Sequence, residues 1–477
     1  MRLTGKIAIM AVGMLLAGSL VQAGPPGEEP ALGSQRITQD DILDGMSLKQ
    51  IQAFGLRIFT TPFNKLDGHG DGPFDPADTI TPGGRPTLGG NGTFLRVNGL
   101  DAQTCLDCHA VVSAATRPPT LGIGGVGTAN NNAIIAPTEI DPADLLDLDG
   151  IAGFNGRLAN PPFVFGAGGV ELLAVEMTTD LQTLKAQALA APGTVVKLTT
   201  KGVEFGSIVA DSLGNLDTSA VKGVSDDLVV RPFGRKGEFT TMRAFDMGAM
   251  MFHFGMQPVE AVGEGIDGDE DGVVDEILVG EISALSVFIA TLPRPQQDRL
   301  DDQGQAGFAS FKTLGCAGCH IPALETISRK LPLRFPEVAE DQTANIFMNI
   351  DLTAPPVKFE KSGTGIRVPL FADLKRHDMG PGLAENFALA DAQTNREFIT
   401  ARLWGIADSA PFLHDGRATT LTEAILAHGG EAQGSRDAYD ALSDSEKIEV
   451  LEFLRTLRMP QPADGPPGLA RGMTDPD

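Results

Sequence analysis

The chain has 477 residues, and its 62 acidic side chains against 37 basic ones give a formal net charge of −25. This length suggests roughly two or three domains, and an apolar share of 42% is too high for a disordered acidic chain. Four cysteines are too few for a disulfide-dense mini-protein. Nucleic acid is not an expected partner, because its phosphates would be repelled by an acidic surface.

The N-terminus has the pattern of a secretory signal peptide. Arg2 and Lys6 precede an apolar run over residues 7–20, which ends in the small-x-small sequence Val21-Gln22-Ala23. An uncleaved anchor helix is the competing interpretation, but the run is short for a membrane span of ~20 residues. We therefore predict a signal peptide over residues 1–23, export to the periplasm, and a mature protein without a membrane span.

The four cysteines occur in two copies of the pattern Cys-x-x-Cys-His. Cys105, Cys108 and His109 form the first copy, and Cys316, Cys319 and His320 form the second. In c-type haem attachment, the two thiols form thioethers to the haem and the adjacent histidine becomes the proximal iron ligand. The sequence thus predicts two covalently bound haems c.

Other uses of these cysteines explain the pattern less well. Two disulfides would be ordinary in an exported protein, but they need no histidine after each pair. A zinc site is a second alternative, although its two pairs usually lie ~15–20 residues apart and these pairs are far more distant in the chain. A thioredoxin-like redox pair is the third, and it does not require the histidine either.

Between the motifs the chain is rich in Gly, Pro and Asn, as in residues 122–136 and 160–169. Long irregular segments of this kind are uncommon unless they are functional or pack against something, and a haem offers such a surface. We expect a mainly α fold with much irregular loop and little strand.

Residues 267–275 read Asp-x-Asp-x-Asp-Gly-x-x-Asp, and alternate carboxylates of this kind can converge on a hard cation. The candidate calcium ligands are Asp267, Asp269, Asp271, Val273 and Asp275. Leu278 stands where an EF-hand has its bidentate glutamate, so the loop is incomplete and a solvated acidic turn is the alternative. Residues 67–75 match this pattern less completely.

Three helices frame the two halves. One over residues 277–292 ends before Pro293, a short one over 304–311 leads to Cys316, and an amphipathic one over 442–457 starts with a Ser443–Glu446 capping box. The domains expected are two cytochrome c-like haem domains, an N-terminal one over 24–296 and a C-terminal one over 297–460. A loose tail is expected over 461–477.

Residues 403–432, together with 375–383, resemble the C-terminal motif of the bacterial di-haem cytochrome c peroxidase superfamily. The likeness is greatest to its di-haem oxidoreductase branch, which is often labelled thiol oxidoreductase. The resemblance implies that His428 is the distal ligand of the C-terminal haem, where the peroxidases usually have methionine. Such a bis-histidine iron has a lower potential. The family also implies a calcium ion between the domains, with Ser409 and Pro411 as two of its ligands.

The first half departs from the peroxidases, because it lacks their Trp-Asp-Gly-Arg-Ala segment and the only tryptophan is Trp404. By resemblance, the distal acid that helps to break the O–O bond is Glu171, and Glu176 is its rival. For either glutamate, a solvated helix face is the alternative. His414 is a further catalytic candidate, expected to orient the loop between the haems.

His253 lies among apolar residues, where an unpartnered imidazole would be costly, so it is a candidate ligand of the first haem. His377 and Met379 are second-choice ligands. The predicted function is a di-haem oxidoreductase, peroxidase-like, that takes electrons from a small cytochrome c or copper protein and reduces peroxide or another small oxidant at one haem. The alternatives are a non-catalytic electron-transfer protein with both irons six-coordinate and an exported binding module with structural haems.

Overall fold

The computed structural model describes residues 28–70, 102–109, 134–140, 154–385 and 392–460. The predicted signal peptide, the tail over 461–477 and part of the second acidic segment over 67–75 lie outside the described residues. Within these ranges, no helix combines the length and the apolar composition that a membrane crossing requires.

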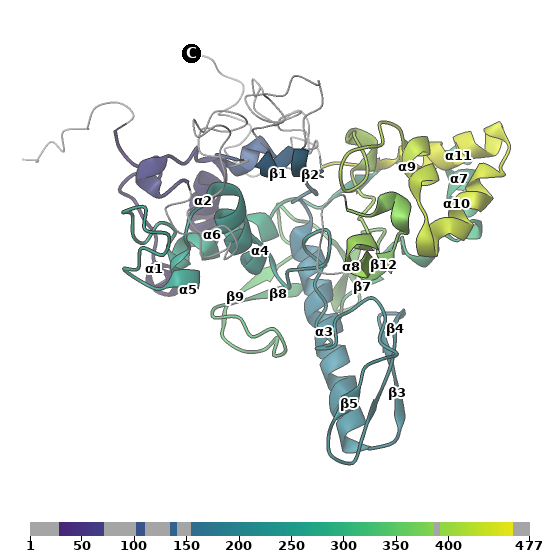
Figure 1. Cartoon of the computed structure of the whole chain (residues 1–477), viewed down its shortest axis with the longest axis horizontal. Coiled ribbons are helices and arrows are strands. Elements are labelled where there is room, and N and C mark those ends of the chain that lie inside the picture. Colours follow the sequence, from purple (N-terminus) through teal and green to yellow (C-terminus); the bar gives the residue numbers. More distant parts are fainter. Residues whose placement is uncertain (1–27, 71–101, 110–133, 141–153, 386–391, 461–477) are drawn as a thin grey trace, which may run out of the picture.

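Two pairs of crossing helices occupy opposite sides of the molecule (Figure 1). Helix α2 (Leu48–Thr60) packs on α6 (Val279–Ala290), and α7 (Asp302–Thr313) packs on α11 (Asp444–Leu454). A glycine lies at each crossing: Gly55 faces the carbonyl of Ala284, and Gly307 faces the carbonyl of Glu449, so neither site has room for a Cβ. The first helix of each pair precedes a Cys-x-x-Cys-His motif, so the same arrangement occurs in both halves of the chain.

The three helices predicted from the sequence are confirmed. Helices α6, α7 and α11 cover the predicted segments, and Ser443 and Glu446 form the expected capping box of α11. Helix α11 ends at Leu454, several residues before Pro460, because Leu457–Arg458 leaves the helix to form strand β14.

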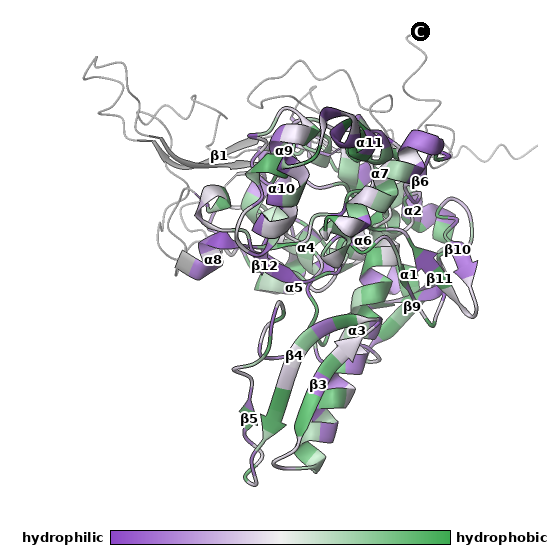
Figure 2. Cartoon of the chain, turned by 90° about the vertical axis from the view of Figure 1, so that its right-hand side faces the viewer, coloured by the Kyte–Doolittle hydropathy of each residue, from purple (hydrophilic) through white to green (hydrophobic). Residues whose placement is uncertain are grey.

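An arm projects from the body of the molecule (Figures 1 and 2). It consists of the second half of α3 (Ala167–Ala190) and the antiparallel sheet of β3 (Val195–Thr200), β4 (Val203–Ala210) and β5 (Leu216–Asp217). The first half of α3 is buried on all sides, from Ala167 to Thr178. Helix α3 therefore joins the arm to the core.

The strand content is higher than the sequence led us to expect. The additional antiparallel strands are β1 (Ile134–Ile140) with β2 (Phe154–Ala159), β8 (Lys330–Arg334) with β9 (Ile346–Asp351), β12 (Arg376–Asp378) with β13 (Glu397–Ile399), and β7 (Leu324–Glu325) with β11 (Gly365–Val368) and β10 (Glu360–Ser362). These strands are two to seven residues long and lie in segments with many Gly and Pro residues, so their alternation of apolar and polar residues is too short to recognise in the sequence.

The other elements that concern the site are short. They are α1 (Gln39–Leu43), α4 (Met242–Ala249), the π-helical turn η6 (Met250–Phe254), α5 (Val259–Val262), α8 (Ala392–Arg396), α9 (Leu421–Ala427), the 3-10 turn η10 (Gly430–Ala432) and α10 (Gln433–Asp440).

Two apolar clusters form the core. The smaller one joins α7, α10 and α11 through Phe311, Tyr439 and Phe453. The larger one contains residues of the first half and also buried residues between Leu324 and Leu374. Strand β6 (Gln296–Gln297) pairs with β14, so the start and the end of residues 296–458 lie side by side. A domain boundary near residue 297 stays a prediction, because the larger cluster draws on both sides of it.

Candidate functional site

Both Cys-x-x-Cys-His motifs fold into the same turn. The first contains the 3-10 helix η3 (Cys105–Asp107), and the second contains η7 (Cys316–Gly318). In each motif the histidine N–H donates to the carbonyl of the first cysteine, at 2.9 Å in both cases. The turn thus brings the two thiols and the imidazole of each motif together on one short segment.

The histidines of the two motifs are oriented by the same kind of hydrogen bond. Nδ1 of His109 lies 3.0 Å from the carbonyl of Pro162, and Nδ1 of His320 lies 3.0 Å from the carbonyl of Phe371. When Nδ1 donates its proton to a carbonyl, Nε2 keeps the lone pair that binds a metal. Burial lowers the pKa of both imidazoles to about 4, so both are neutral at physiological pH.

His428 faces His320 across a gap of suitable width for one iron. The two ring centroids are 6.5 Å apart with an interplanar angle of 61°. An iron between the two rings would make one bond of ~2 Å to a nitrogen of each ring. These two bonds and the distance from each nitrogen to its ring centroid add up to a similar length. His428 caps the C-terminus of α9, and its Nδ1 donates to the carbonyl of Ala424 at 2.7 Å, which again leaves Nε2 for a metal. Burial lowers the pKa of His428.

His253 lies in the first half of the chain, in the π-helical turn η6 that continues α4. After burial, the next cause that lowers the pKa of His109 is its electrostatic interaction with His253. The structure therefore brings His253 near the imidazole of the first motif. A π-turn inside a helix often marks a functional position.

Glu171 is buried near the N-terminus of α4. Its Oε2 accepts a hydrogen bond from the backbone N–H of Met242 at 2.9 Å. Burial raises its pKa to about 7, and the nearby carboxyl group of Glu337 adds to the shift. Asp246, on the next turn of α4, is also fully buried, and its pKa is raised by burial. Three carboxyl groups are thus packed around the helix that leads to His253.

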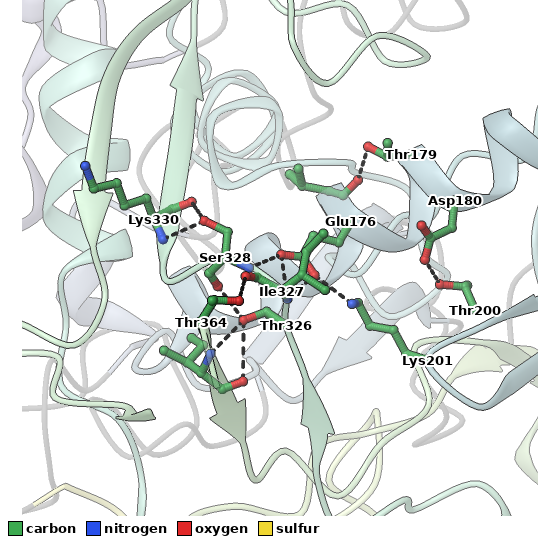
Figure 3. Close-up of polar contacts among 12 residues, drawn as sticks. Glu176, Thr179, Asp180, Thr200, Lys201, Thr326, Ile327, Ser328, Lys330 and Thr364 are labelled. Carbon is green, nitrogen blue, oxygen red and sulfur yellow. Dashed lines mark hydrogen bonds and ion pairs between the residues drawn. The ribbon is translucent and has the colours of Figure 1, made fainter. Parts of the chain in front are cut away.

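Glu176 lies one and a half turns further along α3 in a different environment (Figure 3). Its carboxylate accepts hydrogen bonds from the backbone N–H groups of Ile327 and Ser328 and forms an ion pair of 2.6 Å with Lys201. Both side chains of this pair are nearly buried. Glu176 therefore links α3 to the β3–β4 turn and to the segment after β7.

His414 belongs to a loop that contacts the first half of the chain. Its ring stacks on Phe398 at 4.3 Å, and burial lowers its pKa to about 4. Asn160 donates its backbone N–H to the carbonyl of His414 and its side-chain amide to the carbonyls of Pro411 and Leu413. Among the described residues, Oδ1 of Asn160 is buried without a hydrogen-bond partner.

The acidic loop brings its carboxylates together. Oxygens of Asp267, Asp269 and Asp271 lie within 4.8 Å of one another, and Asp269 is fully buried. Asp275 instead accepts a hydrogen bond from the N–H of Gly265. The carboxyl group next to the cluster is that of Glu276, whose pKa is raised to about 9 by burial and then by these three aspartates. The sequence pattern missed Glu276 because the residue does not occupy a ligand position of an EF-hand.

Trp404 connects the two halves. Its ring lies against Gly166, and the next residue, Gly405, lies against Phe163 and Phe165, whose rings stack at 4.7 Å. Trp404 and Phe371 both line a cavity of about 500 Å³. Trp404 thus lies between the aromatic residues after Pro162 and a cavity that is also lined by Phe371, whose carbonyl binds His320.

Residues 355–457 match the family model described as "Di-haem oxidoreductase, putative peroxidase". This part of the chain is similar to the di-haem oxidoreductase family. The resemblance predicted from the sequence is therefore confirmed, and the family implies two haem cofactors and an oxidoreductase activity. No curated protein matches the sequence of the chain.

The chain is also similar to several solved structures. The diheme peroxidase BthA from Burkholderia thailandensis is 14% identical, with a TM-score of 0.35, over 92% of this chain and 95% of that one. A MauG-like protein associated with microbial copper homeostasis is 16% identical, with a TM-score of 0.28, over 52% and 78%. Hydrazine synthase from Kuenenia stuttgartiensis is 18% identical, with a TM-score of 0.24, over 41% and 67%. These TM-scores are low, so the family assignment rests on residues 355–457.

The ion pair of Glu176 gives a prediction about stability. In the Glu176→Gln variant the buried ammonium group of Lys201 loses its counter-charge, so we expect the free energy of unfolding to fall by ~3 kcal/mol. Chemical denaturation of the purified variant measures this loss. An unchanged unfolding midpoint and slope would contradict a structural role for Glu176.

Proposed function

We propose that the protein is an exported di-haem c-type oxidoreductase that reduces peroxide with electrons from a small cytochrome c or copper protein. The observation that carries the proposal is the pair of identical Cys-x-x-Cys-His turns, each with an imidazole whose Nδ1 is bonded to a carbonyl. When bound, one haem would supply the site of peroxide reduction and the other would store an electron. Each molecule of hydrogen peroxide takes up two electrons and two protons and becomes two molecules of water.

The histidine ligands proposed for the two haem sites differ in what they allow each site to do. His320 and His428 would hold the C-terminal iron from both sides, and such an iron has no open position for peroxide. We therefore place peroxide reduction at the N-terminal site, where His253 would have to leave. Its π-helical turn makes a local rearrangement of the helix easier than a regular turn would.

The proton donor that the geometry supports is Glu171. Its pKa of about 7 allows it both to hold and to release a proton near neutral pH. Glu176 is less suited, because its carboxylate is neutralised by Lys201 and bonded to two backbone N–H groups. Trp404 and the stacked rings of Phe163 and Phe165 offer an electron route between the two sites, in place of the tryptophan segment that the peroxidases have.

The predicted domain boundaries are kept in this proposal. We place the N-terminal haem domain over residues 24–296 and the C-terminal one over 297–460, with segment 324–374 contributing to the core of the first. The signal peptide over 1–23 directs the chain to the periplasm, and the acidic surface suits a donor with a basic docking patch.

The function is tested by electron paramagnetic resonance of the half-reduced holoprotein. We expect a low-spin signal from the bis-histidine C-terminal haem and a change in the signal of the N-terminal haem when hydrogen peroxide is added. If both haems stay low-spin and peroxide changes nothing, the protein is the electron-transfer protein of the alternative hypothesis, with both irons six-coordinate.

The two glutamates are distinguished by turnover. We expect Glu171→Gln to lower the rate of peroxide reduction by ~10²-fold or more, since the glutamine cannot transfer a proton. Glu176→Gln is the matched control and should leave the turnover of the folded enzyme near that of the wild type. Steady-state kinetics with a reduced small cytochrome c measures the turnover of both variants. If Glu176→Gln lowered the turnover and Glu171→Gln did not, Glu176 would be the acid.

Calcium is the remaining proposed cofactor. Asp267, Asp269 and Asp271, with the carbonyl of Val273, would bind it, and Glu276 would replace Asp275 as the last carboxylate. Ser409 and Pro411 belong to a second candidate site, where Oδ1 of Asn160, which has no hydrogen-bond partner among the described residues, would be an additional oxygen ligand.

Calorimetry of the chelated protein tests both sites. We expect calcium uptake that weakens at least tenfold when Asp269 and Asp271 become Asn, because two ligand charges are lost. A second uptake that survives this change would belong to the loop at Asn160, and an Asn160→Ala variant should remove it. If chelated protein takes up no calcium, both loops are ordinary turns.

A further inference from the structure

One short segment, residues 371–378, contacts both His320 and the loop that follows His428. The carbonyl of Phe371 accepts the hydrogen bond from Nδ1 of His320. The same segment continues to Asp373 and then to His377 on strand β12. These residues lead to the loop that follows His428.

His377 bridges two carboxylates. Its Nε2 lies 2.9 Å from Oδ2 of Asp373, and its Nδ1 lies 2.8 Å from Oε2 of Glu431. A carboxylate accepts hydrogen bonds, so both ring nitrogens are donors and the imidazole is a cation. Neither nitrogen is then left for an iron. His377 is 7% exposed and its bond to Asp373 is buried, whereas the side chain of Glu431 is 56% exposed.

The Asp373 end of the bridge is fixed. Asp373 is 1% exposed, and its Oδ1 accepts hydrogen bonds from the backbone N–H of Lys375 at 3.0 Å and from the hydroxyl of Thr400 at 2.7 Å. Thr400 directly follows strand β13, which pairs with β12. Asp373 therefore anchors the imidazolium to this small sheet.

The Glu431 end is attached to the distal loop. Glu431 is three residues after His428, and its Oε1 accepts a further hydrogen bond from the N–H of Asp378 at 3.1 Å. Gly430 lies so close to the carbonyl of Asp378 that a Cβ would not fit. Residues 429–431 thus lie directly on the end of β12, and the Glu431–His377 bond completes the contact.

We propose that His377 is a positioning residue: through Glu431 it holds the loop that presents His428 and so keeps His428 opposite His320. The inference rests on the proposed function, in which His428 is an iron ligand. The bridge runs close to the haem attachment point, since Sγ of Cys319 is 3.9 Å from Nδ1 of His377. Release of His428 would therefore require the Glu431–His377 bond to break first.

Carbon monoxide binding to the ferrous holoprotein tests this role. Carbon monoxide can bind to the C-terminal iron only after His428 dissociates from it. The kinetic phase of binding at this iron therefore reports the rate at which His428 dissociates. The phase is identified by a His428→Ala variant, in which it should become much faster. We expect Glu431→Ala to accelerate it about tenfold, since the charged hydrogen bond that holds the loop is lost.

Two further variants separate positioning from general loosening. Glu423→Ala removes the capping-box carboxylate of α9, five residues before His428, but leaves the bridge intact, so the rate should stay at the wild-type value. His377→Phe should accelerate the phase like Glu431→Ala, and the double variant should be no faster than either, because both residues act through one bond.

The outcomes are distinct. Wild-type rates in both Glu431→Ala and His377→Phe would overturn the role of His377, and so would an equal acceleration in Glu423→Ala. If the wild-type protein shows no bis-histidine spectrum and His428→Ala leaves carbon monoxide binding unchanged, the assignment of His428 in the proposed function fails, and the inference fails with it.

Discussion

The hydrogen bond from Nδ1 of a motif histidine to a backbone carbonyl is the constraint on which the rest of the site depends. It fixes the tautomer and the direction of the ring, and so determines where an iron can lie. In the first half the acceptor is Pro162, in the segment that leads into α3. In the second half it is Phe371, whose side chain belongs to the core formed with α7 and α11. The packing of each half therefore sets the position of its imidazole.

The two halves are joined by contacts that bring the sites into one structure. Asn160 binds the loop that carries His414, and Trp404 packs against the turn before α3. The larger apolar cluster includes strands that lie between the second motif and residue 374. A relative displacement of the halves would expose this cluster and break the bonds of Asn160, so we expect the distance between the two sites to be nearly fixed.

Much of the second half could be predicted from the sequence. The motif Cys316-x-x-Cys-His320 and the helices α7 and α11 depend on local patterns. The choice of His428 came from the family resemblance, and the structure places His428 opposite His320. The contacts of His377 and Glu276 could not be predicted, because each depends on carboxylates brought close by tertiary packing. Glu171 and Glu176 lie five residues apart on the same helix and could not be separated by sequence pattern, although their environments differ completely. The short hairpins were missed because strands of two or three residues carry too little periodicity.

Glu171 and His253 lie at the two ends of one continuous helical stretch. Glu171 binds the N–H of Met242 at the start of α4, and α4 runs directly into the π-turn that contains His253. A charged carboxylate stabilises a helix N-terminus more than a neutral one does, because the helix dipole is positive there. With a pKa of about 7, Glu171 changes its charge within the physiological range, and with it the strength of this cap. We therefore expect the loss of a proton from Glu171 to strengthen the start of α4 and its uptake to loosen it. Such a change at the start of α4 would reach His253 through the backbone of a single helix, because the π-turn continues α4 without a break.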